Sequence, residues 1–188
     1  EILCAENVSV RTLGYSLDIA ELLYDRVTAN EASRLGFWIK LQELLKHRWE
    51  RLDASMQFSA RMVERLYLGE HAGNVFPSED NTPGVASSLH RDLSGKTLAI
   101  YSLMKGAARR GKEALLQLYP GLEVELNHDH VATPALVNLA KTADYFIFAS
   151  SSSKHQAFYA VTDYRKEIIY PSGKGASSMI ASFVRAME

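Results

Sequence analysis

The sequence predicts an α/β protein in which a small, Rossmann-like parallel sheet of about four strands follows an N-terminal helical region. From residue 96 onward, short apolar runs of strand length alternate with longer amphipathic stretches, a pattern typical of βαβ units. Before residue 72, apolar residues recur at helical spacing. The intervening residues 73–95 are rich in Gly, Pro, Asn and Ser. We therefore expect a helical region at 1–72, a linker at 73–95 and a Rossmann-like ligand-binding domain at 96–188.

Three helices are predicted in the first region, each from one apolar stripe. Asn30 and Ser33 are candidate N-caps of the second helix, and Gly69 with Gly73 is expected to end the third. The three stripes consist of Leu17, Ala20, Tyr24 and Val27, then Leu35, Trp38, Ile39 and Leu45, then Leu52, Met56, Val63, Leu66 and Tyr67.

In the second region, Pro120-Gly121 is expected to end one helix and Thr133-Pro134 to open the next. Within the expected strand 144–149, the stretch 145–149 is continuously apolar, as in a strand buried on both faces, so we expect this strand to be central. Right-handed crossovers then favour the strand order 2-1-3-4, with a topological switch point between the first and third strands. The expected strands are 97–103, 122–126, 144–149 and 167–171, and the expected helices are 105–118, 134–142, 154–162 and 176–187.

Composition limits the functional classes. The 188 residues are 47% hydrophobic and 23% charged, with a net charge of −1, which excludes a strongly basic nucleic-acid binder as the default interpretation. A local basic pocket, and with it nucleic acid as a ligand, stays open. The single cysteine, Cys4, excludes an internal disulfide and a cysteine-based metal site, and no cofactor is indicated. No apolar run reaches the roughly 20 residues that span a bilayer. We expect a cytoplasmic protein that does not contact a membrane.

Polar turns that carry lysine follow three of the expected strands. In a parallel sheet such turns meet at the carboxyl edge, where backbone N–H groups and helix N-termini form an anion site. Glycines permit close approach of an anion, lysines neutralise charge and serines donate hydrogen bonds. We also expect Ser177 or Ser178 to cap the last helix. The predicted ligand-binding residues are Ser102, Lys105, Ser151, Lys154, His155, Gly173, Lys174, Gly175 and Ser177.

Other interpretations of these residues stay open. Each turn can be an ordinary strand-to-helix connection whose lysine is solvated. His155, assisted by Lys154, can act as a general acid or base near neutral pH. His128 and His130, two apart on an extended segment, have the spacing of a metal pair, but the sequence specifies no third ligand, so we place them at the pocket rim. Asp144 begins a strand at the opposite edge and is expected to be a boundary or cap residue.

Residues 95–188 resemble the Rossmann-like ligand-sensing domains of prokaryotic defence systems, including the CARF-type domains. The shared features are Tyr101-Ser102 after the first strand, Ser153-Lys154-His155 after the third, and Gly173-Lys174-Gly175 with Ser177-Ser178 before the last helix. The resemblance implies a cyclic or linear oligonucleotide second messenger as the ligand, and it implies a role in antiviral defence signalling.

Three functions are therefore open. The first is a module that senses a nucleotide or phosphorylated nucleotide-like ligand. The second is an enzyme acting on a nucleotide, phosphate or glycosyl substrate. The third is an assembly subunit without a ligand, whose N-terminal helices contact a protein partner. The sequence also leaves open a homo-oligomer.

Overall fold

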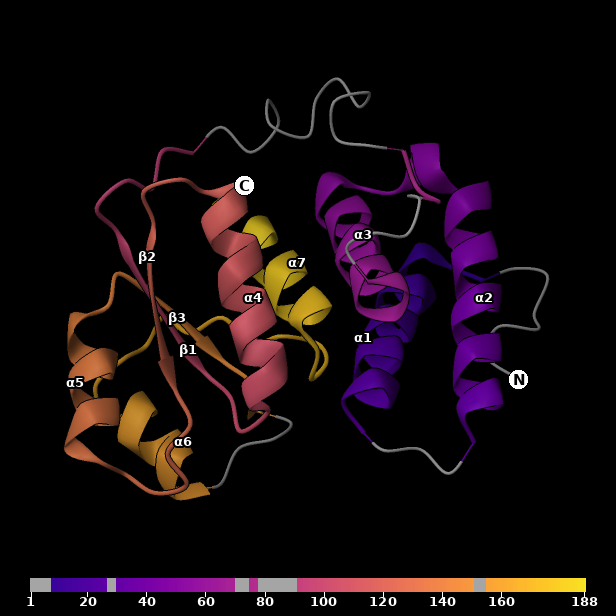
Figure 1. Cartoon of the computed structure of the whole chain (residues 1–188). Helices are drawn as coiled ribbons and strands as arrows, with labels where there is room; N and C mark the ends of the chain where they lie inside the picture. Colours follow the sequence, from indigo (N-terminus) through magenta and orange to yellow (C-terminus); the bar gives the residue numbers. More distant parts are fainter. Residues whose placement is uncertain (1–7, 27–29, 70–74, 78–90, 151–154) are drawn as a thin grey trace. The chain divides into compact units, whose positions relative to one another are not determined.

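The structure, a computed structural model, describes residues 8–26, 30–69, 75–77, 91–150 and 155–188 (Figure 1). The chain divides into two units, Glu1–Ser88 and Leu89–Glu188, and each is described by itself. No helix among the described residues is both long enough and apolar enough to cross a membrane.

The first unit is helical, with α1 (Val10–Asp25), α2 (Glu31–His47), a 3-10 turn (Trp49–Arg51) and α3 (Ala54–Leu68). The three predicted helices are confirmed. Short polar side chains begin each of them, since Ser9, Asn30 and Asp53 accept hydrogen bonds from backbone N–H groups of the first turn. Gly69 ends α3 with a φ of 76°, a conformation that favours glycine.

Aromatic side chains form much of the core of this helical unit. Trp38 stacks on Tyr67 with ring centroids 5.1 Å apart, and Trp49 stacks on Phe76 at 4.8 Å. Phe76 lies inside the range that we expected to be a linker. The Tyr67 hydroxyl donates to the carbonyl of Ala20 at 2.9 Å, so its polar end is satisfied inside the unit.

The apolar stripe predicted for α2 is partly wrong. Leu35 is 39% exposed and Ile39 is 52% exposed, whereas Trp38, Leu41 and Leu45 are buried. The spacing of the three buried residues places them on one narrow face of a helix with 3.6 residues per turn. Leu35 and Ile39 lie to one side of that face, which explains why an apolar residue type alone did not identify the core positions.

The second unit contains a parallel sheet of three strands, β1 (Thr97–Tyr101), β2 (Glu123–Asn127) and β3 (Tyr145–Phe148), in the order β2-β1-β3. The order of these three strands agrees with the expected order 2-1-3-4. β1 pairs with a strand on each side, whereas β3, which we also expected to be central, has β1 on one side and only an isolated bridge on the other. The predicted fourth strand at 167–171 is reduced to one parallel bridge between Ile147 and Ile169. Pro171, which has no N–H group to donate, follows soon after this bridge and cannot extend the ladder.

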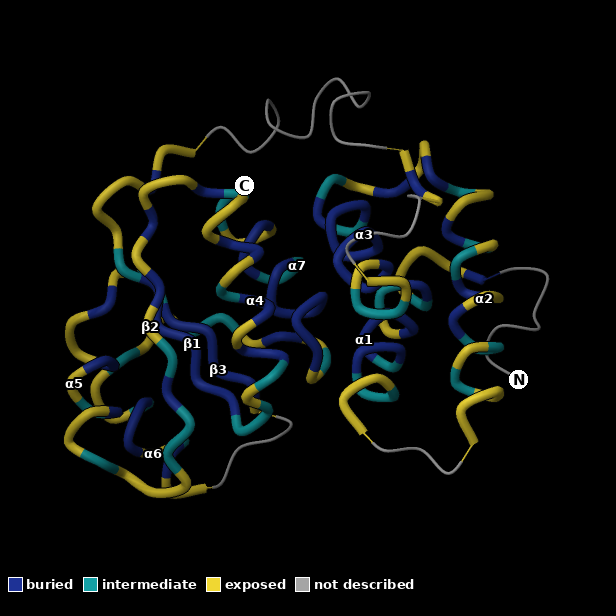
Figure 2. Tube along the Cα trace, in the orientation of Figure 1, coloured by how far each residue is buried: buried dark blue, intermediate teal, exposed yellow. Residues whose placement is uncertain are grey.

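Helices cover both faces of the sheet, and β1 and β3 are buried on both sides, whereas Glu123 and Glu125 of β2 are exposed (Figure 2). On one face α4 (Lys105–Leu118) packs against α7 (Ala176–Met187) and the strands. On the other face lie α5 (Pro134–Thr142) and α6 (His155–Thr162), which pack against each other. The ranges predicted for the first, second and fourth helices of this unit agree with α4, α5 and α7.

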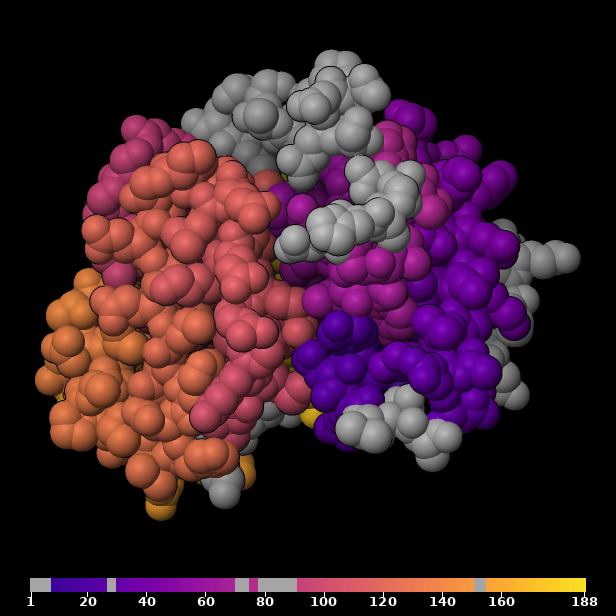
Figure 3. Space-filling view, in the orientation of Figure 1, coloured from indigo at the N-terminus to yellow at the C-terminus, as the bar shows by residue number. Residues whose placement is uncertain are grey.

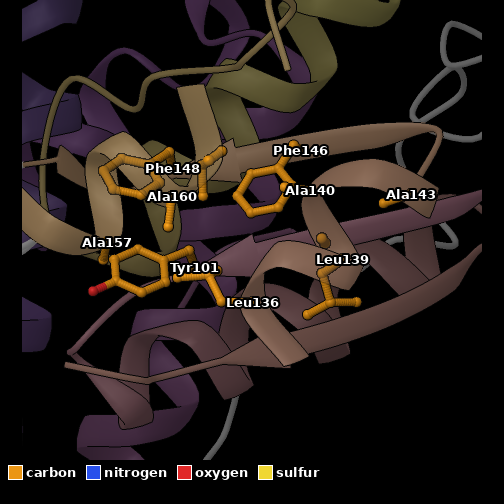
Figure 4. Packing of buried hydrophobic residues seen from close by; sticks show 11 residues of the cluster. Tyr101, Leu136, Leu139, Ala140, Ala143, Phe146, Phe148, Ala157 and Ala160 are labelled. Atoms are coloured by element: carbon orange, nitrogen blue, oxygen red, sulfur yellow. The ribbon is translucent and has the colours of Figure 1, made fainter. Parts of the chain in front are cut away.

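The core beneath α5 and α6 is made of alternate residues of β1 and β3 and of small or aliphatic helix residues (Figure 4). Tyr101 of β1 and Phe148 of β3 stack with ring centroids 4.6 Å apart. Their neighbours in the strands face α4 and α7 instead, since successive side chains of a strand point to opposite faces. The cluster comprises Ala99, Tyr101, Leu136, Leu139, Ala140, Ala143, Phe146, Phe148, Ala157, Ala160 and Val161.

Asp144 lies at the amino edge of the sheet, as the sequence analysis expected. Its carboxylate accepts hydrogen bonds from the backbone N–H of Thr97 and from Lys96 Nζ, each at 2.9 Å. The Thr97 N–H and then the Lys96 ammonium hold the pKa of Asp144 below its usual value. The side chain thus joins the starts of β1 and β3 and carries no sign of a ligand role.

Candidate functional site

Three of the connections that leave the carboxyl edge of the sheet, where the strand arrows end in Figure 1, are those predicted to bind a ligand. The first leads from β1 to α4, the second from β3 to α6, and the third from the Ile169 bridge to α7. Because all strand pairings are parallel, the three connections share one edge. The structure therefore places the turns at Lys105 and Lys174, together with the start of α6, on the same side of the sheet.

The first connection ends at the N-terminus of α4. The N-cap residue of this helix, Met104, makes no side-chain hydrogen bond that caps it. Lys105 is the first residue of this helix and is exposed. The N–H groups at a helix start carry partial positive charge, and the Lys105 ammonium adds a full charge. This end of α4 thus has the polarity that attracts an anion.

Ser102, in contrast, is engaged inside the protein. It is fully buried, and its hydroxyl accepts a hydrogen bond from the backbone N–H of Met104 at 3.1 Å. The backbone N–H of Ser102 donates to the carbonyl of Asn127 at 3.1 Å. The hydroxyl therefore shapes the turn after β1. The sequence analysis predicted Ser102 as a ligand-binding residue, but its hydroxyl does not lie at the surface.

The third connection ends at the N-terminus of α7, where the N-cap is Gly175, which has no side chain to cap the helix. Lys174 is exposed and Gly173 is half-buried. Ser177 lies inside α7 and is 4% exposed, so the expectation that Ser177 or Ser178 caps this helix is wrong. The result is a second helix start with a lysine directly before its N-cap.

The second connection is only partly described. His155 is the first residue of α6 and is exposed. Ser151 and Lys154, which we also expected to bind the ligand, lie outside the described residues. Of the predicted set, the structure thus brings Lys105, His155 and Lys174 to the surface of the carboxyl edge.

The connection from β2 to α5 contributes an interaction that the sequence analysis missed. His128 Nδ1 donates to the carbonyl of Ser102 at 2.6 Å, which requires the proton on Nδ1 and leaves Nε2 as an acceptor in the neutral ring. The Tyr101 hydroxyl donates to the carbonyl of Asp129 at 2.9 Å. The one available signal was position, because His128 directly follows the strand that pairs with β1.

Asp129 stabilises the connection from β2 to α5 through hydrogen bonds to neighbouring residues of the same segment. Its carboxylate accepts hydrogen bonds from the Thr133 hydroxyl and from Asn127 Nδ2. The Thr133 bond, and next the Asn127 bond, lower the pKa of Asp129. Asp129 and His128 are therefore engaged within the loop, and the described part of the chain contains no group of three His, Cys, Asp or Glu residues that could hold a metal ion.

Comparison with known protein families gives a match over nearly the whole chain. A family model described as DpdD-like matches residues 1–182. No curated protein and no solved structure matches the sequence.

Proposed function

Because the chain belongs to the DpdD-like family, and this membership points to prokaryotic DNA modification and defence, we propose that its second unit senses a nucleotide or nucleotide-like phosphate ligand. The ligand binds at the carboxyl edge of the sheet. The site is a binding module that reports the ligand to the rest of a defence system.

One observation carries this proposal. The helices α4 and α7 both begin at this edge, an exposed lysine stands at the start of α4 and directly before the N-cap of α7, and the N-cap residue of α4 provides no side-chain cap. In many helices, a Ser, Thr, Asp or Asn side chain at the N-cap accepts a hydrogen bond from an N–H group of the first turn, as Thr133 does for α5 in this unit. The uncapped start of α4, together with the two lysines, is suited to phosphate oxygens, which accept hydrogen bonds from N–H groups and from ammonium groups.

The residues divide into direct and supporting roles. Lys105 and Lys174 neutralise phosphate charge, and the half-buried Gly173 lets a phosphate approach the backbone closely, whereas Gly175 is buried at the N-cap of α7. Ser102 acts indirectly, because its buried hydroxyl sets the turn that aims the start of α4. His155 stands at the start of α6 and can donate a hydrogen bond from its ring.

The first test is a thermal melt of the whole chain with a panel of mononucleotides, dinucleotides, NAD derivatives, and cyclic and linear oligonucleotides. A ligand that binds only the folded state adds about 2.7 kcal/mol of stability at a hundredfold excess over its Kd. We expect one class to raise the Tm by several degrees. Lys174→Ala should weaken its binding by about 1.5–3 kcal/mol, the value of a charged hydrogen bond.

The matched control is Lys166→Ala. Lys166 is also exposed but lies between α6 and the Ile169 bridge, before the chain reaches the carboxyl edge. It should leave the affinity unchanged. Equal affinity of Lys174→Ala and the native protein in titration calorimetry would remove Lys174 from the site. No shift with any ligand would favour the assembly-subunit alternative.

The second candidate function is an enzyme of nucleotide, phosphate or glycosyl chemistry. It is favoured by the contact of His128 with the Ser102 carbonyl, which orients an imidazole beside this edge. The sequence analysis favoured His155 with Lys154 in this role. Turnover of a bound nucleotide that is lost in His128→Ala or His155→Ala, with binding retained, would establish catalysis. Binding without turnover in the native protein would leave the sensor.

A further inference from the structure

A second cationic site lies in the helical unit, at the end of α2. A cavity of about 620 Å³ opens there between the last residues of α2, the 3-10 turn and the segment 75–77. In the space-filling view this segment (magenta) lies on the surface beside the purple side chains of α2 (Figure 3). The lining residues are Lys46, His47, Arg48, Trp49, Glu50, Arg51, Val75, Phe76 and Pro77.

The lining is cationic. Lys46, Arg48 and Arg51 bring three positive charges against the single carboxylate of Glu50. Within the described residues, no ion pair neutralises any of the three cations. Basic residues in the last turn of a helix also stabilise its dipole, which accounts for Lys46. It does not account for Arg51, which follows in the 3-10 turn and is exposed.

Arg48 adds an independent observation. Its Nη1 atom is buried and has no hydrogen-bond partner in the part of the chain that the structure describes. A buried donor of a charged group is costly to leave unpaired. An anionic oxygen beside the guanidinium offsets part of this cost electrostatically, and phosphate and carboxylate oxygens match the geometry of a guanidinium.

The aromatic residues of the cavity limit what it recognises. Trp49 is only 5% exposed, because Phe76 stacks on it at 4.8 Å and the Arg61 guanidinium lies 5.0 Å from its ring centroid. Both contacts occupy the ring, so Trp49 does not offer a stacking surface for a base. The cavity therefore suits the phosphate of a ligand rather than its base.

We propose that this cavity binds phosphate groups, through Arg48, Arg51 and Lys46, without reading base identity. It is distinct from the site at the carboxyl edge of the sheet and does not depend on it. The phosphate belongs either to a nucleic-acid backbone or to a free phosphate compound. The sources differ in salt dependence, because release of counterions makes backbone binding fall steeply with salt.

The test uses the whole chain and three probes. These are a fluorescein-labelled single-stranded DNA of mixed sequence, its duplex, and pyrophosphate. Fluorescence anisotropy follows the labelled DNA, and titration calorimetry follows pyrophosphate. We expect Arg51→Gln to weaken binding of the recognised probe about tenfold or more, as for loss of a charged hydrogen bond. For single-stranded DNA, the slope of log K against log salt should also become shallower by about 0.7 for each phosphate that the variant no longer neutralises.

Three variants make the result specific. Lys40→Gln removes an exposed cation from the same helix outside the cavity and should leave binding unchanged. Arg51→Lys retains the charge and should restore part of the affinity. Arg51→Gln should weaken binding by the same factor in a Lys174→Ala background, which separates this cavity from the carboxyl-edge site. Arg51 is exposed, so folding of its variants, checked by circular dichroism, is expected to be native.

The outcomes separate the sources. Binding of DNA that is sensitive to Arg51→Gln assigns a nucleic-acid backbone, and binding of pyrophosphate alone assigns a free phosphate compound. The proposal is overturned if no probe binds, if Lys40→Gln weakens binding as much as Arg51→Gln does, or if an acidic peptide such as poly-glutamate binds more tightly than every phosphate probe.

Discussion

Arg165 is a side chain that binds several backbone carbonyls of the sheet unit. Its Nε donates to the carbonyl of Glu167, and its two terminal nitrogens donate to the carbonyls of Ala143 and Asp144. Burial lowers the pKa of the Arg165 guanidinium, which is nevertheless charged at neutral pH because the pKa of arginine lies so high. Arg165→Gln should lower the free energy of unfolding by about 1–3 kcal/mol, since it leaves backbone acceptors unsatisfied.

Urea unfolding measures this change. Lys166→Gln is the control, because Lys166 is exposed and makes no hydrogen bond or ion pair with another described residue. It should alter stability by less than about 0.5 kcal/mol. If both variants have the same stability, the contacts of Arg165 do not stabilise the fold.

At the scale of elements, α5 depends on a single cap. Thr133 Oγ1 accepts a hydrogen bond from the backbone N–H of Leu136 at 3.2 Å and donates to Asp129. Thr133→Ala should destabilise the protein by about 1 kcal/mol through loss of the cap. Thr133→Ser keeps both bonds and should restore most of that stability. An alanine variant as stable as the native protein by thermal melt would contradict the role of the cap.

The same cap shows why some elements were predictable. Thr133-Pro134 and Pro120-Gly121 are local signals, and α5 begins and α4 ends where those signals place the boundaries. The 167–171 segment has strand-forming residues, yet it makes only the Ile147–Ile169 bridge. Pairing of a strand depends on partners that are distant in sequence, and a local pattern of residue types does not reveal how far the ladder extends.

The candidate site was predictable to a lesser degree than the helices. The topology of a parallel sheet brings its turns to one edge, so Lys105 and Lys174 were expected there. The burial of the Ser102 hydroxyl and the position of Ser177 inside α7 were not predicted, because a serine in a turn can cap a helix, face a ligand or be buried. His128 was assigned to the rim, and its hydrogen bond to Ser102 depends on the pairing of β1 with β2.

For the whole molecule, three carboxylates with lowered pKa values, those of Asp92, Asp129 and Asp144, make stability depend on pH in acid. The folded-state pKa values of Asp129 and Asp144 are lowered, each by hydrogen bonds to its carboxylate. A carboxylate whose pKa is lowered by folding stabilises the folded state at pH values above its unfolded-state pKa of about 3.9. This stabilisation is lost as the pH falls through the folded-state pKa. We therefore expect the free energy of unfolding to fall as pH is lowered below about 4.

The variant Asp144→Asn tests this dependence. It should be less stable than the native protein at pH 7, and the difference should shrink as the pH is lowered below about 4. Asp163→Asn is the control, because Asp163 is exposed in the turn after α6. A constant difference between Asp144→Asn and the native protein across this range, measured by urea unfolding, would show that the Asp144 carboxylate does not have a lowered pKa.

The most direct test of ligand binding at the carboxyl edge is a ¹H–¹⁵N NMR titration of the whole chain with each nucleotide of the panel. Binding of phosphate at the starts of α4 and α7 should shift the backbone amide signals of Lys105–Ala107 and Ala176–Ser178, and Lys174→Ala should reduce those shifts. Saturable shifts confined to residues outside both helix starts, or no shift with any nucleotide, would contradict a phosphate site at this edge.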